Sequence, residues 1–191
     1  MSPVAEQAVR PDPAWLGPMR TAARAAAAAF PLPTRYQEGW GRLDYAGVDL
    51  AGIPAVEGEV ERTLKDVPSG LVVTSLRDAM REHPEIVRVN LERPVDGGVL
   101  TRFAALNSAG WREGLCCLAP RGRDLAGLPA VAGAACPPGW ARVSTRWIGS
   151  GAMFPRTIVV AEPESRLTLV EEWAGGWPGA VASGHVQIHV K

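Results

Sequence analysis

The first part of the chain carries apolar residues at helical spacing. Between residues 15 and 30 they fall on one face of a helix: Trp15, Met19, Ala22, Ala23, Ala26 and Phe30. Five consecutive alanines, Ala25–Ala29, add helix propensity, and Pro31 and Pro33 end the segment because proline cannot continue a helix. We therefore predict a helix over residues 15–30. It follows a Pro-rich stretch, residues 1–13, that we expect to be disordered.

Two further helices are predicted before residue 112. Leu71–Val73 predicts a short strand, after which Ser75 and Asp78 have the spacing of a capping box at the start of a helix. Pro84 limits that helix because the residue before a proline is disfavoured in helical geometry. A third helix is predicted over residues 99–109, with Leu100, Phe103 and Leu106 on its inner face.

Beyond Gly110 the helical spacing disappears. Short apolar runs are separated by Gly and Pro turns, a pattern that predicts many short strands: residues 115–118, 125–131, 141–148, 157–161, 167–172 and 185–190. The sequence therefore predicts an α+β chain with a helical domain over residues 1–112 and a β domain over residues 113–191. The spacing of the runs suits a sandwich or a β-solenoid.

Composition narrows the class of protein. The 191 residues include 20 basic and 20 acidic side chains, so the formal net charge is zero and a strongly basic nucleic-acid binder is not expected. Apolar residues make up 47% of the chain, yet no apolar run has the length of a membrane span. The N-terminus lacks the pattern of a secretory signal, and three cysteines form no disulfide framework. We expect a cytoplasmic protein that binds neither nucleic acid nor membranes.

Common phosphate-binding and hydrolase motifs are missing from the sequence. The chain has no Gly-Lys dipeptide and therefore no P-loop. It has no G-x-G-x-x-G dinucleotide motif and no G-x-S-x-G nucleophile elbow.

The three cysteines permit two interpretations. Cys116 and Cys117 are neighbours in a predicted strand, so their side chains point to opposite faces and cannot bind one ion together. Cys136 has no C-x-x-C partner. These residues are either small buried hydrophobes or reactive thiols, as in a persulfide carrier, a cluster ligand or a thiol enzyme.

Histidine, glutamate and tryptophan give no firm site. His185 and His189 alternate with apolar residues in a predicted strand, which separates the two rings by roughly 13 Å, too far for one metal ion. Glu171 and Glu172 face opposite sides of their strand and form no acid/base pair. Four tryptophans of the β part either close a small core or form a sugar-stacking surface: Trp140, Trp147, Trp173 and Trp177.

Three stretches of the chain resemble the SufB/SufD family, the scaffold proteins of bacterial iron–sulfur cluster assembly, and its SufD-like members in particular. They are Leu32–Trp40 (Leu-Pro-Thr-Arg-Tyr-Gln-Glu-Gly-Trp), Phe103–Ala109 (Phe-Ala-Ala-Leu-Asn-Ser-Ala), and Phe154–Glu162 running into Leu167–Glu171. The order and spacing of the three stretches carry the resemblance. The chain departs from the family after Trp40, where Gly-Arg-Leu replaces the usual Arg/Lys-Tyr-Thr.

The resemblance implies a helical N-terminal domain followed by the first turns of a right-handed parallel β-helix. It implies a non-catalytic scaffold that acts with SufB-like and SufC-like proteins, ATP being hydrolysed by the SufC-like partner. The family's chains are longer, so we expect a fragment whose β-helix is unfinished. The family's cluster-related residues and SufC contact lie in later regions. The resemblance therefore assigns no catalytic, cofactor-binding or metal residue to this chain, and no cofactor to this segment. The alternative is a carbohydrate-binding or carbohydrate-active β-solenoid.

Overall fold

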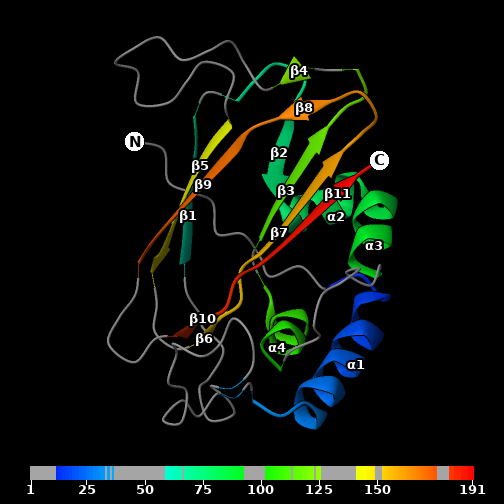
Figure 1. Cartoon of the computed structure of the whole chain (residues 1–191), viewed down its shortest axis with the longest axis vertical. Helices are drawn as coiled ribbons and strands as arrows, with labels where there is room; N and C mark the ends of the chain where they lie inside the picture. The colour runs from blue at the N-terminus through cyan, green and yellow to red at the C-terminus, as the bar shows by residue number, and fades with distance from the viewer. Residues whose placement is uncertain are drawn as a thin grey trace.

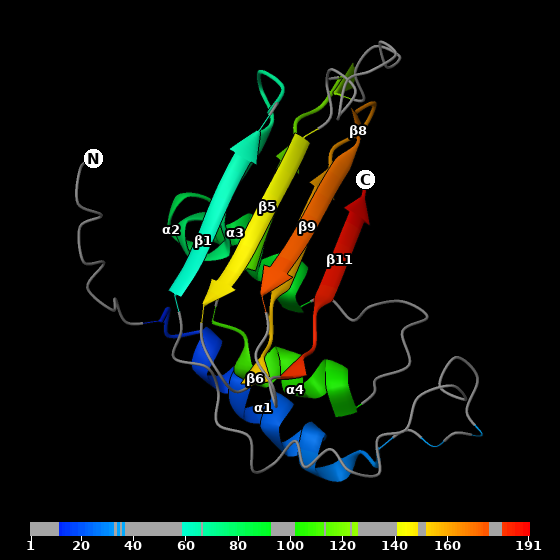
Figure 2. The same cartoon turned by 90° about the vertical axis from the view of Figure 1, so that its left-hand side faces the viewer.

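The computed structural model describes residues 12–32, 34, 36, 59–65, 67–92, 102–112, 114–122, 124–125, 141–148, 152–175 and 181–191. Within these ranges the elements form three layers, with helices on one side, a four-stranded sheet in the middle and a three-stranded sheet on the other side (Figure 1). Figure 2 shows the three-stranded sheet from the front, with two helices beneath the sheets.

The two helices beneath the sheets are α1 (Leu16–Ala29) and α4 (Arg102–Gly110), which pack against each other. The predicted helix over residues 15–30 is confirmed, since Phe30 turns to an extended conformation directly before Pro31. The third predicted helix is confirmed by α4, while residues 99–101 of that prediction lie outside the described residues.

The other two helices are α2 (Leu76–Glu82) and α3 (Pro84–Glu92). The predicted capping box is confirmed, because the Asp78 N–H donates to Ser75 Oγ at 2.9 Å and the Ser75 hydroxyl donates to the Asp78 carboxylate at 2.7 Å. The helix α2 ends before Pro84 as predicted. The sequence prediction missed α3, which Pro84 begins, because proline is tolerated in the first turn of a helix.

The four-stranded sheet has the order β11-β7-β3-β2. Its strands are β2 (Val72–Ser75), β3 (Gly114–Ala119), β7 (Arg156–Ala161) and β11 (His185–Val190). The strands β3, β7 and β11 are parallel and in register, so that Gly114, Arg156 and His185 lie side by side. The strand β2 pairs antiparallel with β3.

The three-stranded sheet has the order β1-β5-β9, made of β1 (Glu59–Lys65), β5 (Ala141–Ile148) and β9 (Leu169–Gly175). Here β5 and β9 are parallel, and β1 is antiparallel to β5. Two short parallel pairs join the sheets at their ends: β4 (Asp124–Leu125) with β8 (Arg166–Leu167), and β6 (Ala152–Met153) with β10 (Val181–Ala182).

The predicted α+β class is confirmed, but the right-handed parallel β-helix is wrong. Among the described residues the strands form open, mixed sheets that are neither closed nor solenoid-like. Each larger sheet contains an antiparallel strand from the first half of the chain, β1 in one and β2 in the other. Short apolar runs identify strands locally, but they do not determine which strands pair or in which direction.

The described apolar core lies on both faces of the four-stranded sheet. On the helix side, Cys116, Ile158 and Val160 pack with α2, α3 and Trp111. On the side that faces the other sheet, Leu115, Cys117 and Val159 pack with Val143 of β5. Alternation along the parallel strands separates the two sets.

The division into domains at residue 112 stays a prediction. The strands β1 and β2 belong to the predicted first domain and pair with β5 and β3 of the predicted second. The helix-side core also combines residues from both parts, among them Leu76, Val87 and Ile158.

A close approach of two strands makes Gly114 sensitive to substitution. A Cβ atom at Gly114 would lie 2.1 Å from the backbone oxygen of Arg156. We expect Gly114→Ala to destabilise the protein by about 2 kcal/mol or more, since a central strand must move to relieve the overlap. Urea unfolding monitored by circular dichroism measures this change.

The matched control is Gly17→Ala in α1, where an added Cβ meets nothing within 4 Å. That variant should unfold at the same or a higher urea concentration, because alanine favours a helix by up to about 1 kcal/mol over glycine. Equal midpoints for Gly114→Ala and the parent protein would contradict the close packing of β3 on β7.

Candidate functional site

The two described cysteines lie in the centre of the fold. Both are fully buried on β3, Cys116 on the helix side and Cys117 between the sheets, so the prediction of opposite faces is confirmed. Burial raises the pKa of the Cys116 thiol to about 12 and raises the pKa of Cys117 further. Both thiols are therefore protonated at neutral pH, and this geometry favours the interpretation as small buried hydrophobes. Cys136 lies outside the described residues.

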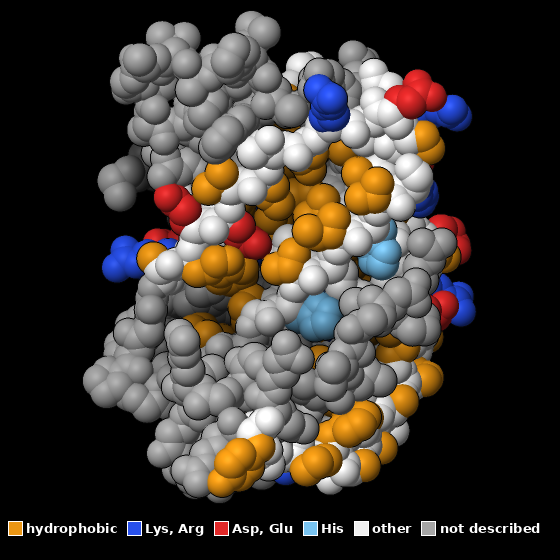
Figure 3. Space-filling view, viewed as in Figure 1, with side chains coloured by type: hydrophobic (Ala, Val, Ile, Leu, Met, Phe, Trp, Pro, Cys, Tyr) orange, Lys and Arg blue, Asp and Glu red, His pale blue; other side chains and the backbone are white. Residues whose placement is uncertain are grey.

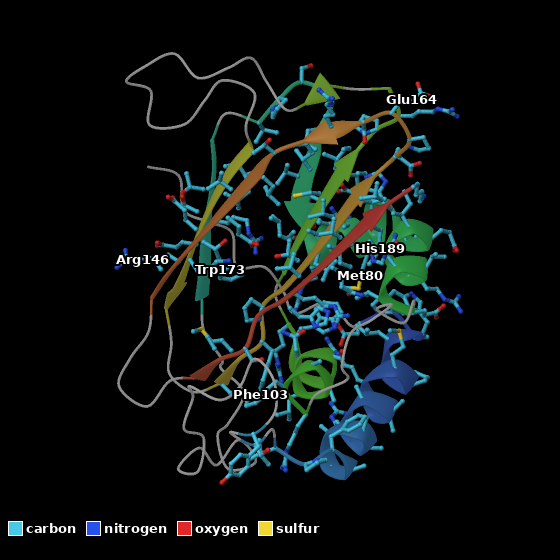
Figure 4. All side chains as sticks on the ribbon, in the orientation of Figure 1. Met80, Phe103, Arg146, Glu164, Trp173 and His189 are labelled. Atoms are coloured by element: carbon cyan, nitrogen blue, oxygen red, sulfur yellow. The ribbon has the colours of Figure 1, made fainter. Side chains whose placement is uncertain are left out.

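The two histidines of β11 and the two glutamates of β9 lie on the faces that strand alternation requires. His185 and His189 are on the strand β11 and share the face that turns towards the helices. Figure 4 labels His189 on this strand. Glu171 lies between the sheets, where Thr157 Oγ1 donates to both of its carboxylate oxygens at 3.0 Å. Glu172 faces the other way and accepts from Ser144 at 2.9 Å. The predicted opposite faces of the two glutamates are confirmed.

Two partly buried titratable groups are shifted by their surroundings. Burial raises the pKa of Glu171, and the hydrogen bond from Thr157 opposes that shift. Burial lowers the pKa of His185, and the neighbouring guanidinium of Arg156 lowers it further. Both shifts favour the neutral form of the side chain.

A group of buried and half-buried polar side chains joins the helix α4 to the four-stranded sheet. We call it the polar junction and define it as Asn107, Ser108, Arg156 and Gln187. The amide nitrogen of Asn107 donates to the backbone oxygens of Pro155, at 2.9 Å, and Ser183, at 2.7 Å. These carbonyls stand just before β7 and β11, so one side chain of α4 connects to the start of both strands.

Arg156 is the only charged member of the polar junction. Its Nε donates to Gln187 Oε1 at 3.0 Å, its Nη2 donates to the same oxygen, and its Nη1 donates to Ser108 Oγ at 3.0 Å. No ion pair joins Arg156 to a carboxylate in the described ranges, and burial lowers its pKa to about 10. The guanidinium stays charged at neutral pH and is held by neutral acceptors.

Sequence reasoning did not select the members of the polar junction as a site. The available signal was in the resemblance: Asn107 and Ser108 belong to its second stretch, and Arg156 to its third. The structure brings these two stretches together through the hydrogen bonds of Asn107 and Arg156. Thr157 and Glu171, also in the third stretch, bind each other.

The described tryptophans do not gather on one surface. Trp173 on β9 is 41% exposed and lies across from β11 (Figure 4), whereas Trp111 is buried in the helix-side core. The side chain of Trp147 and the residues Trp140 and Trp177 lie outside the described part of the structure. Of the four tryptophans of the predicted sugar-stacking surface, Trp173 is the one whose side chain the structure describes, and it is exposed.

An exposed apolar surface lies beside Trp173. Val186, Ile188 and Val190 of β11 are 57%, 67% and 79% exposed. Figure 3 shows hydrophobic side chains gathered on this face of the molecule, between β9 and β11. We call Val186, Ile188, Val190 and Trp173 the β11 edge surface.

In the described ranges no group of three or more His, Cys, Asp or Glu side chains is arranged to hold a metal ion. None of the described helices combines the length and hydropathy that a membrane crossing requires. No model of a known protein family matches the sequence, and no curated protein matches it.

Burial of the β3 thiols predicts that they resist alkylation. We expect iodoacetamide at pH 8 to leave Cys116 and Cys117 unmodified in the folded protein and to modify both in urea, because only the thiolate reacts. Peptide mapping by mass spectrometry distinguishes these residues from Cys136. Rapid modification of Cys116 in the folded protein would instead favour the thiol-enzyme interpretation.

The lowered pKa of His185 predicts a loss of stability in acid. The unfolded chain binds a proton at His185 near its ordinary pKa of about 6.5, which the folded chain resists, so stability decreases as the pH falls through that range. In His185→Gln this decrease should be smaller. The raised pKa of Glu171 makes its own contribution to stability increase as the pH falls, and this contribution is the same in the parent protein and in His185→Gln. Urea unfolding at pH 5 and pH 7.5 tests this, and identical pH dependence in parent and variant would contradict it.

Proposed function

We propose that this chain is a non-catalytic scaffold component of iron–sulfur cluster assembly, of the type found in complexes of SufB, SufC and SufD. It acts in the cytoplasm through SufB-like and SufC-like partners. ATP is hydrolysed by the SufC-like protein, and the cluster is handled by the complex rather than by a site on this segment.

One observation carries the proposal: residues of the stretches that resemble the family form hydrogen bonds with one another and so hold helices and strands together. The side-chain amide of Asn107, in the second stretch, donates to the Pro155 carbonyl of the third stretch. The Arg156 guanidinium of the third stretch donates to the Ser108 hydroxyl of the second. Within the third stretch Thr157 donates to Glu171. Polar side chains that are occupied in holding strands and helices support a structural role for the stretches that carry the resemblance.

The first stretch differs from the other two in its exposure. Tyr36 is 82% exposed, whereas the described residues of the second and third stretches are buried or half-buried. Large aromatic side chains are enriched in protein interfaces because they bury much area at low entropic cost. We therefore propose that Tyr36 contacts a partner.

Co-purification tests the proposal. The chain is produced together with a tagged SufB-like protein and a SufC-like protein from the same source, and the purified complex is analysed for composition, iron and acid-labile sulfide. We expect the parent chain to co-purify, and Tyr36→Ala to reduce its recovery several-fold.

The matched control is Leu64→Ala, which changes an exposed apolar side chain on β1 outside the three stretches. It should leave recovery unchanged. Absence of the parent chain from the purified complex would refute the proposal. Binding to a glycan array that Trp173→Ala abolishes would instead support the carbohydrate-binding alternative.

A further inference from the structure

The helices α1, α2 and α4 bring a group of arginine side chains to one part of the helical layer. We call this group the arginine surface and define it as Arg20, Arg24, Arg77 and Arg112. Arg20 and Arg24 belong to α1, and Arg77 belongs to α2. Arg112 follows Trp111, just beyond the end of α4. Segments that are far apart in the sequence therefore contribute positive charge to the same region.

Backbone carbonyls beyond the end of α4 hold two of these side chains. Arg20 Nη2 donates to the Trp111 oxygen at 2.8 Å, and the guanidinium lies over the Trp111 ring, 5.2 Å from its centroid. Arg77 Nη2 donates to the Arg112 oxygen at 3.4 Å. Cations are favoured here because the C-terminal end of a helix carries partial negative charge. A carbonyl has no formal charge, so these contacts position the two side chains without neutralising them.

The positive charge of the arginine surface is only partly balanced. Asp12 pairs with Arg20. Arg24 and Arg112 are exposed, and neither forms an ion pair with a described residue. Glu113, the sequence neighbour of Arg112, lies outside the described residues. By contrast, other exposed arginines pair with carboxylates of their own chain: Arg81, Arg88, Arg121 and Arg146.

The like charges of the arginine surface repel one another. Burial lowers the pKa of Arg20 most, and the positive charges of Arg112 and Arg24 lower it further, against the opposing effect of Asp12. Arginine stays charged at neutral pH, so the protein does not relieve this repulsion by releasing a proton. A bound anion relieves it, which favours an anionic partner at this surface.

We propose that the arginine surface binds an acidic segment of a partner protein, with carboxylates of that segment contacting Arg24 and Arg112. A guanidinium offers parallel N–H donors to the two oxygens of a carboxylate, so such a contact has a defined direction as well as opposite charge. This proposal goes beyond the scaffold function and does not depend on it, because it concerns the chemistry of the surface rather than the identity of the partner.

The size of the arginine surface favours a short acidic segment over a nucleic acid. Asp12 contacts Arg20, and Asp78 directly follows Arg77 on α2, so negative charge borders the surface on both sides. The whole chain has a net charge of zero. Nucleic-acid binders neutralise many phosphates along an extended basic track, which the described residues here do not form.

A nuclear magnetic resonance titration with a defined probe tests the proposal. The probe is a blocked hexaglutamate peptide, and the equivalent hexaglutamine peptide is its control. We expect hexaglutamate to shift the side-chain signals of Arg20, Arg24 and Arg112 in a saturable manner, with weaker binding at high salt because ions screen exposed charges. Hexaglutamine should leave these signals unchanged.

Charge reversal tests whether binding occurs at the arginine surface. Arg24→Glu combined with Arg112→Glu should weaken hexaglutamate binding about tenfold or more, because two attractive contacts become repulsive. The matched control is Arg121→Glu combined with Arg166→Glu, which changes the net charge by the same amount. These two residues are exposed and lie near β4 and β8, at the other end of the molecule from α1 and α4 (Figures 1 and 2). The control should bind hexaglutamate as the parent chain does, and circular dichroism checks that both variants are folded.

Three results overturn the proposal. The first is hexaglutamate binding no tighter than that of hexaglutamine. The second is undiminished binding by the folded Arg24→Glu, Arg112→Glu variant. The third is equal binding of inorganic phosphate, or tighter binding of a single-stranded hexanucleotide, at the same signals, since these identify a general anion site or a nucleic-acid site. Hexaglutamate binding that the double variant loses and the control retains supports the proposal, whether or not the chain co-purifies with SufB-like and SufC-like proteins.

Discussion

The strand β7 is buried on both of its faces, and the described structure is arranged around it. Ile158 and Val160 pack against the helices, while Val159 packs between the two sheets. Its neighbours β3 and β11 run parallel to it in the same register. A strand that is buried on both sides must supply apolar groups to two cores at once, which explains why its run Thr-Ile-Val-Val-Ala is almost continuously apolar.

The polar exceptions on β7 stand at its start. Arg156 and Thr157 are both buried, and each is satisfied by a partner from another element: Gln187 and Ser108 for Arg156, and Glu171 for Thr157. An isolated charge in this position would be strongly destabilising. The hydrogen bonds compensate that penalty only in one arrangement of α4, β7 and β11, so this cluster specifies how the layers fit together as well as stabilising them.

Local features of the sequence predicted local structure well. The helix over residues 15–30 and the Ser75 cap depend on neighbours within a few positions, and both are confirmed. Pro84 was interpreted only as an end, although the same residue begins α3. β1 was not predicted because its charged residues interrupt the apolar pattern, and its strand conformation depends on pairing with β5, about eighty positions away.

Long-range relations could not be predicted in this way. β1 pairs antiparallel with β5, and β2 pairs antiparallel with β3, which excludes the predicted β-helix. The local patterns of these segments do not specify their partners. Asn107 and Pro155 are likewise 48 positions apart, so the polar junction had no signal in spacing or periodicity. The alternation of Cys116 with Cys117 and of Glu171 with Glu172 was predictable, because it follows from the strand itself.

The two hydrogen bonds donated by Asn107 have a consequence for folding. They bind the carbonyl of Pro155, directly before β7, and the carbonyl of Ser183, two residues before β11 and 76 positions after the amide. The Asn107 side chain on α4 therefore fixes the starts of β7 and β11 relative to each other. The hydrogen bond to Ser183 forms only when residues 76 positions apart meet, so α4 and β11 share a non-local contact of the kind that slows folding.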